Sequence, residues 1–232
     1  MKIKTFIVTI VLSLILIFLG YNFRNLIDYS TAIFTVVIVL LMITYLYFEK
    51  SSMGTKEIAL IATLSAFAGA SRVPFAVLPN IQPTTFLVAL FGYVFGIYRG
   101  FLIGVTTAFI SNIFLGQGPW TIWQMLAWGI VGALSGIIGS KYKKQRISTE
   151  NFSFICFLYG FIFDWIMNLW HILGYIKPLT LESIILTYVT SLSFDIMHST
   201  GNFVFSVMLF DSLYKVLNRF RKKLEITYIN KF

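Results

Sequence analysis

Two apolar stretches of this chain each carry a carboxylate, an amide and an imidazole at helical spacing. The two sets are Asp164, Asn168 and His171, and Asp195, His198 and Asn202. A helix places each set on one face, and because the second helix runs back across the first, we expect the faces to meet. An ionisable group in mid-membrane costs at least about 2.5 kcal/mol on insertion scales, so both faces are functional candidates. Side-chain pairs that only join two helices are the structural alternative.

Imidazole and carboxylate groups also bind zinc, nickel or cobalt, so a metal site is a further alternative. The sequence has no His-Glu-x-x-His motif, and Cys156 is its one cysteine, which excludes a thiolate cage. It also lacks a Gly-x-Ser-x-Gly elbow and a Walker-type phosphate loop. We therefore expect no metal, no cofactor and no enzymatic activity.

A third polar group lies between two apolar runs, in Gly116-Gln117-Gly118-Pro119-Trp120-Thr121-Ile122-Trp123-Gln124-Met125. The glycines predict a turn, and Pro119 can open the next helix because the first helical turn needs no donor from it. The two indole rings offer stacking faces, and the amides of Gln117 and Gln124 offer hydrogen bonds. An aromatic belt at the membrane interface is the alternative explanation for Trp120 and Trp123.

Other polar residues fall on the same side of the chain. Arg72 lies near the end of an apolar run, and Asn80 and Gln82 follow it in a turn. Together with Asn112 and the Gly116-to-Met125 segment, they would line an outward-facing cavity that suits a vitamin-sized organic ligand better than an ion. Snorkelling of the Arg72 side chain to the interface is the alternative.

These residues belong to a chain with the composition of an integral membrane protein. Of its 232 residues, 58% are hydrophobic and 12% are charged, about half the charged share of a soluble domain. Long runs of Leu, Ile and Val predict an all-α bundle rather than an outer-membrane barrel. The net charge of +9 comes from short basic clusters that the positive-inside rule explains, so we expect no nucleic-acid partner.

A helix that spans a membrane needs about 20 mostly apolar residues. On that criterion we predict eight transmembrane helices, at 5–22, 30–48, 56–76, 84–98, 100–115, 120–140, 152–175 and 184–214. The basic residues fall on one side, which is predicted to be cytoplasmic and to hold both termini: Lys2, Lys4, Lys50, Lys56, Arg99 and the clusters 141–146 and 219–223. The polar tract 49–54 predicts a boundary between an accessory two-helix hairpin, 1–54, and a six-helix substrate-binding domain, 55–232.

The first helix of the predicted six-helix domain has a face of small side chains. Ala62, Ala66 and Ala70 follow one another at intervals of four residues. Small faces let helices approach closely, so this face packs either inside the bundle or against a partner subunit. The sequence leaves both alternatives open.

The helix Ala62-x-x-x-Ala66-x-x-x-Ala70, the turn Leu78-Pro79-Asn80-Ile81-Gln82-Pro83-Thr84 and the Gly116-to-Met125 segment resemble the S component of energy-coupling factor (ECF) vitamin transporters. The resemblance covers about residues 55–220, and the N-terminal hairpin departs from the usual six-helix pattern. It implies a subunit of the bacterial plasma membrane that captures a vitamin outside the cell. A transmembrane coupling subunit and two ATPases would then drive uptake, and the most similar members are associated with cobalamin or its precursors.

From this resemblance and from position, we expect the ligand to contact twelve side chains: Asn80, Gln82, Gln117, Trp120, Trp123, Gln124, Asp164, Asn168, His171, Asp195, His198 and Asn202. The resemblance also implies that Ala62, Ala66 and Ala70 dock the coupling subunit. Two other functions stay open: a membrane interaction or sensory subunit without cargo, and a stand-alone secondary transporter. The residue types do not choose among cobalamin, riboflavin, a nucleobase derivative and a queuine-like base.

Overall fold

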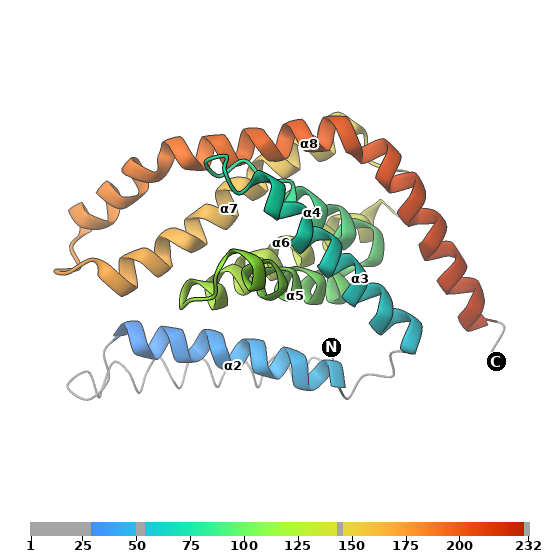
Figure 1. Cartoon of the computed structure of the whole chain (residues 1–232), viewed down its shortest axis with the longest axis horizontal. Coiled ribbons are helices and arrows are strands. Elements are labelled where there is room, and N and C mark those ends of the chain that lie inside the picture. The colour runs from blue at the N-terminus through green and yellow to red at the C-terminus, as the bar shows by residue number, and fades with distance from the viewer. Residues whose placement is uncertain (1–28, 50–53, 143–145, 230–232) are drawn as a thin grey trace.

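The computed structural model describes residues 29–49, 54–142 and 146–229, and the regular elements in these ranges are all helical (Figure 1). They are α2 (Tyr29–Glu49), α3 (Thr55–Arg72), the short 3₁₀ helix η1 (Val73–Phe75), α4 (Thr84–Phe95), α5 (Ile97–Leu115), α6 (Trp120–Lys141), α7 (Thr149–Tyr175) and α8 (Leu181–Ile229). The predicted all-α architecture is confirmed for these residues. The predicted helix 5–22, Lys2, Lys4 and Lys50 lie outside them.

Glycine and proline residues set several of the helix boundaries. Gly96 separates α4 from α5 with a φ of 94°, and Gly116 ends α5 with a φ of 105°, both values that favour glycine. Pro119 directly precedes α6, as the sequence predicts. At α7 the Ser148 side chain accepts a hydrogen bond from the Asn151 backbone N–H at 3.3 Å, which caps the helix.

Four helical segments of the described chain are long and apolar enough to cross a membrane, which supports a multi-pass protein. They are Thr55–Phe75, Ile97–Leu115, Trp120–Lys141 and Thr149–Tyr175. The prediction of a spanning helix at 84–98 is wrong, because α4 has only 12 residues and each of them is buried. At 1.5 Å per residue it is about 18 Å long, so it serves as a central core helix.

The last predicted helix also differs from the structure. The prediction of 184–214 is too short at both ends, because α8 extends from Leu181 to Ile229 over 49 residues. Hydropathy ends the prediction at the charged residues, but Lys, Arg and Leu are good helix formers and continue the helix. In Figure 1, α8 arches over the rest of the bundle, with α7 running back beneath it.

Three glycines bring α4, α5 and α6 into backbone contact. A Cβ atom built on Gly132 would lie 2.1 Å from the Gly100 carbonyl oxygen, and one on Gly92 would lie 2.1 Å from the Gly132 oxygen. These distances leave no room for a methyl group at either position. The core therefore forms around α4, with the fully buried rings of Phe86, Phe91 and Trp128 beside this glycine junction.

Charged residues join helices at the end of the bundle predicted to be cytoplasmic. Arg99 at the start of α5 pairs with Glu57 in the first turn of α3. Arg146 pairs with Asp211 of α8 at 2.6 Å, and its guanidinium lies 5.3 Å from the ring centroid of Phe210. These contacts hold the start of α5 to the start of α3, and the segment before α7 to α8.

Helix α2 packs against α5, α6 and α7. Its Val37 and Leu41 form a buried cluster with Val105 of α5 and Trp123 of α6. The Ser30 hydroxyl donates a hydrogen bond to the carbonyl oxygen of Leu173 in α7. In Figure 1, α2 runs along the lower side of the bundle, across from α8.

Candidate functional site

A chain of hydrogen bonds links α4, α6, α7 and α8 inside the bundle. The Trp128 indole N–H donates to the Thr85 hydroxyl oxygen at 2.8 Å, and that hydroxyl lies 2.9 Å from Nε2 of His198. On the other side of the imidazole, Nδ1 lies 2.9 Å from Oδ2 of Asp164. Asn80 then donates from Nδ2 to both Asp164 oxygens, at 3.2 and 3.3 Å. We call these five residues the inner network.

The inner network is satisfied with a neutral imidazole. Thr85 accepts from Trp128 and donates its own proton to Nε2 of His198, and the Nδ1–H of His198 donates to the Asp164 carboxylate. The side chains of Thr85, His198 and Asp164 are all buried. A buried polar group needs hydrogen-bond partners, and both oxygens of Asp164 have them here.

A second group of bonds surrounds Arg72, the last residue of α3. Its Nε donates to Oε1 of Gln82 at 2.6 Å, and its Nη1 donates to Oδ1 of Asn112 at 3.0 Å and to the Ser111 hydroxyl at 3.2 Å. Asn112 in turn donates from Nδ2 to Oε1 of Gln124 at 2.6 Å. We call this group, with Thr121 and Gln117, the Arg72 network.

The Arg72 network also holds the loop before α6. Asn112 donates to the Thr121 hydroxyl oxygen at 3.0 Å, and Thr121 donates to Oε1 of Gln117 at 3.0 Å. The other end of the Gln117 amide donates to the Phe109 carbonyl oxygen at 2.9 Å. Gln117 and Gln124 therefore fix the loop and the helix start that the sequence singled out.

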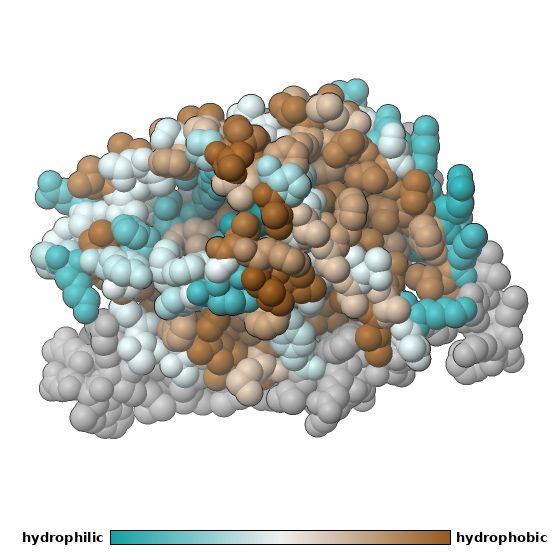
Figure 2. Space-filling model, viewed as in Figure 1, coloured by the Kyte–Doolittle hydropathy of each residue, from teal (hydrophilic) through white to brown (hydrophobic). Residues whose placement is uncertain are grey.

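Trp128 connects the two networks. Its indole N–H belongs to the inner network, and the Arg72 guanidinium lies over its ring, 5.3 Å from the centroid. Polar groups from four helices and from the turn 76–83 thus meet around one fully buried indole. Figure 2 shows hydrophilic side chains set back in a hollow between the first part of α8 and the ends of α5 and α6.

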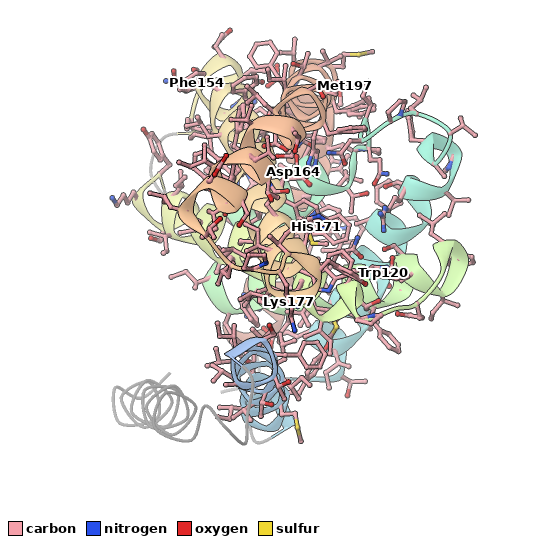
Figure 3. The ribbon with its side chains drawn as sticks, turned by 90° about the vertical axis from the view of Figure 1, so that its left-hand side faces the viewer. Trp120, Phe154, Asp164, His171, Lys177 and Met197 are labelled. Atoms are coloured by element: carbon pink, nitrogen blue, oxygen red, sulfur yellow. The ribbon has the colours of Figure 1, made fainter. Side chains whose placement is uncertain are left out.

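Aromatic side chains lie toward the predicted outer end of the same region. Trp120 of α6 meets Trp170 of α7 edge to face, with 6.1 Å between ring centroids, and Trp170 meets Tyr175 at 5.4 Å. The exposed ring of His171 stacks on Tyr175 at 5.6 Å. In the view of Figure 3, Asp164 and His171 follow one another along α7, and Trp120 lies across from them. We call these four rings the aromatic rim.

The predicted meeting of the two polar faces occurs. Asp164 pairs with His198, while His171 belongs to the aromatic rim. The Asn168 amide donates to the Ser191 hydroxyl oxygen at 2.7 Å, and Ser191 donates to Oδ2 of Asp195 at 3.3 Å. Asn168 and Asp195 therefore join α7 to α8 above the inner network.

Two further predicted ligand residues, Asn202 and Trp123, make no side-chain hydrogen bond in the described part of the chain. Asn202 is fully buried, and neither its amide nitrogen nor its oxygen has a partner in the described part of the chain. Trp123 is 3% exposed and packs in the cluster with Val37 and Leu41, on the side of α6 that faces α2. There it lines a pocket of about 390 Å³ with Phe34 and Trp170.

The sequence analysis missed Thr85 and Trp128, which lie at the centre of the inner network. Both stand in predominantly apolar helices, where their pattern is that of ordinary core positions. Their residue types gave one weak indication of a polar network, because a buried Trp N–H or Thr hydroxyl needs a hydrogen-bond partner. The described residues contain no group of three His, Cys, Asp or Glu side chains arranged to hold a metal ion.

Comparison with known proteins shows that the chain matches a protein family. Residues 52–219 match the family described as ECF-type riboflavin transporter, S component. A UPF0397 protein of Aliivibrio salmonicida is 27% identical over 139 residues, which cover 58% of this chain and 73% of the relative. A UPF0397 protein of Vibrio atlanticus is 31% identical over 97 residues, covering 40% of this chain and 53% of the relative. No solved structure matches the chain.

The family match confirms the resemblance drawn from the alanine face, the proline-rich turn and the Gly116-to-Met125 segment. It gives no support to the expected association with cobalamin, because the family is described by riboflavin. The family is one of transporter subunits rather than enzymes. With more than half of its residues matched, this membrane protein belongs to the S component family of ECF-type riboflavin transporters.

Proposed function

We propose that this chain captures a planar heterocyclic vitamin on the outer side of the bacterial plasma membrane, with riboflavin as the first candidate. The observation that carries the proposal is the convergence of the inner network and the Arg72 network on Trp128, beside the aromatic rim. Such a site combines ring faces with a few well-placed donors and acceptors, which is typical of small-molecule pockets. We keep ten of the twelve predicted residues in the proposed site and leave out Trp123, which faces α2, and Asn202, which bonds to neither network.

The arrangement favours a flat ligand over a bulky one. Trp120, Trp170 and Tyr175 form a continuous set of rings on which a heterocycle can stack. Gln124 of the Arg72 network follows Trp120 by one turn of α6, so the amides of this network would bond to the edge of the same heterocycle. A corrinoid is several times larger than a three-ring flavin, and the short turn 76–83 is tied down through Gln82 and Asn80. We therefore place cobalamin behind riboflavin.

The alanine face supports a docking role in uptake. Ala62, Ala66 and Ala70 are all exposed, whereas Leu64 and Ala68 on the opposite side of α3 are buried in the bundle. Internal packing thus uses another face of α3, which leaves the small side chains free for a partner helix. We propose that they dock an ECF transmembrane coupling subunit, which two ATPase subunits would power.

The division of the chain fits this proposal. The family match begins at residue 52, close to the predicted boundary at 54, and α2 packs on the outside of α5, α6 and α7. We propose that residues 1–54 form an accessory hairpin and that 55–232 form the substrate-binding domain. The hairpin would then support the bundle without taking part in capture.

Thermal unfolding of the purified full-length protein tests the proposal. A ligand that binds only the folded state raises the unfolding midpoint in proportion to the logarithm of its concentration. We expect riboflavin to raise the midpoint, and thiamine, biotin and cobalamin to leave it unchanged. A shift with cobalamin alone would restore the corrinoid assignment. If no compound of the panel shifts the midpoint, an interaction subunit without cargo becomes the better account.

A further inference from the structure

The Arg72 side chain carries a positive charge that no carboxylate balances in the described part of the chain. The ion pairs of the described residues include Arg99 with Glu57 and Arg146 with Asp211, and neither of them involves Arg72. All three acceptors of Arg72 are neutral, namely Gln82, Asn112 and Ser111. A cation in a membrane protein's interior is costly without a counter-charge, so its position calls for an explanation.

The bonds of Arg72 leave one edge of its guanidinium unused. Nε donates to Gln82, and the two N–H groups of Nη1 suffice for Asn112 and Ser111. Nη2 has no acceptor among the described residues, and it is also absent from the buried polar atoms that lack a partner. The side chain as a whole is half-buried. Two N–H donors on Nη2 are therefore accessible from outside the protein.

The surroundings of Arg72 hold this edge in a fixed direction. Gln82 bonds it from the turn 76–83, Asn112 bonds it from α5, and the Trp128 ring lies 5.3 Å below its central carbon. A guanidinium fixed by three elements loses little entropy when it binds a ligand, which strengthens each bond that it makes. Snorkelling to the interface would leave it with water rather than with these partners.

We propose that Nη2 of Arg72 binds an electron-rich carbonyl oxygen on the edge of the cargo's heterocycle. The inference rests on the proposed function and specifies its substrate class. The cargo is a neutral or anionic ring system with oxygen acceptors, such as the dione ring of a flavin, and a cationic vitamin such as thiamine is excluded by repulsion. The oxygens of Asp164 already accept hydrogen bonds from Asn80 and His198, so this carboxylate has less capacity left to bind a cationic cargo.

Quantitative titration separates recognition by Arg72 from a merely structural role. Riboflavin and lumichrome, which keeps the ring carbonyls but lacks the sugar-derived chain, are each titrated into purified full-length protein. The variants are Arg72→Gln, Arg72→Lys and the control Arg219→Gln. The control removes an exposed arginine in the C-terminal part of α8. The unfolding midpoint of each variant without ligand is measured alongside.

Because Arg72→Gln removes a charge-assisted hydrogen bond, we expect it to weaken the binding of both ligands by about 10- to 100-fold. Arg72→Lys should recover part of the affinity because it keeps the charge but not the planar fork. Arg219→Gln should bind as the unmodified protein does. A loss that appears with riboflavin but not with lumichrome would overturn the inference, since the contact would then be to the chain.

Two further outcomes distinguish this inference from the proposed function. If the unmodified protein binds riboflavin and Arg72→Gln binds it equally well, the inference fails and the proposed function stands. Binding of thiamine by the unmodified protein contradicts the inference in the same way. If the unmodified protein binds neither flavin, the proposed function fails, and the assignment of Arg72 to a flavin edge fails with it.

Discussion

Asp164 of α7 and His198 of α8 are joined by a hydrogen bond of 2.9 Å between Oδ2 and Nδ1, with the two side chains 8% and 4% exposed. This contact restricts the relative rotation of the two helices, because both side chains must face the same buried position. It also aligns Thr85 and Trp128 behind the imidazole. The polar site is thus built on a bond between α7 and α8, and the later part of α7 carries Trp170, His171 and Tyr175 of the aromatic rim.

Removing His198 is expected to destabilise the protein far more than removing His171. His198→Ala leaves the Asp164 carboxylate buried with Asn80 as its remaining side-chain donor, and breaking a buried pair costs about 3–5 kcal/mol. His171→Ala removes an exposed ring that stacks on Tyr175, so its cost should stay below about 1 kcal/mol. Thermal unfolding of both variants gives the comparison. Equal midpoints would show that the inner network does not support the fold.

The glycine junction predicts a large cost for one added methyl group. Gly132→Ala would place a Cβ atom 2.1 Å from the Gly100 carbonyl oxygen, where only backbone movement relieves the clash. Overpacking of this kind costs about 1–3 kcal/mol or more. Gly174→Ala is the matched control, because nothing lies within 4 Å of the position of its Cβ. A Gly132→Ala variant as stable as Gly174→Ala would contradict the close approach of α5 and α6.

Two tryptophans one turn apart on α6 should respond differently to truncation. Trp120→Ala removes a ring of the aromatic rim and should weaken riboflavin binding by about 3- to 10-fold, with little change in the unfolding midpoint. Trp123→Ala removes a ring that is 3% exposed in the cluster with α2, so it should lower the midpoint and leave the affinity of the folded protein unchanged. If Trp123→Ala weakens binding and Trp120→Ala does not, the ligand binds on the side of α6 that faces α2.

Bulk on the alanine face should abolish uptake without affecting capture. Ala66→Trp places a large ring on the exposed face of α3 and prevents close approach of a partner helix. Ser193→Trp adds the same ring to an exposed position of α8 and serves as the control. Riboflavin binding by the purified variants and uptake in cells with the coupling and ATPase subunits are measured together. Normal uptake by Ala66→Trp would rule out docking through this face.

The sequence predicts the helices of this fold well where glycine and proline mark their ends. The predicted start of 120–140 agrees with α6 because Pro119 precedes it, and α5 ends at Leu115 as predicted because Gly116 follows. The boundary between α4 and α5 was placed at 98–100, but the chain breaks at Gly96. Hydropathy continues unchanged across that glycine, so composition alone gives no sign of the break.

The candidate site was predictable in its residue types more than in its contacts. Helical spacing placed Asp164 and His198 on inward faces, but it does not give the rotation and height of α7 against α8 that make them partners. Spacing also grouped Trp123 with Trp120 and Gln124. One residue turns a helix by about 100°, so Gln124 reaches the Arg72 network while Trp123 faces α2. Closeness in sequence therefore did not predict which of these side chains face the same site.

The most direct test of the account is an equilibrium titration of riboflavin into the purified full-length protein in lipid nanodiscs, followed by quenching of flavin fluorescence. Stacking of a flavin on Trp120 and Trp170 predicts strong quenching that saturates at one ligand per chain. Unlabelled lumichrome should compete, and thiamine should not. Fluorescence that stays unquenched at every protein concentration would contradict the proposal that this S component captures a flavin.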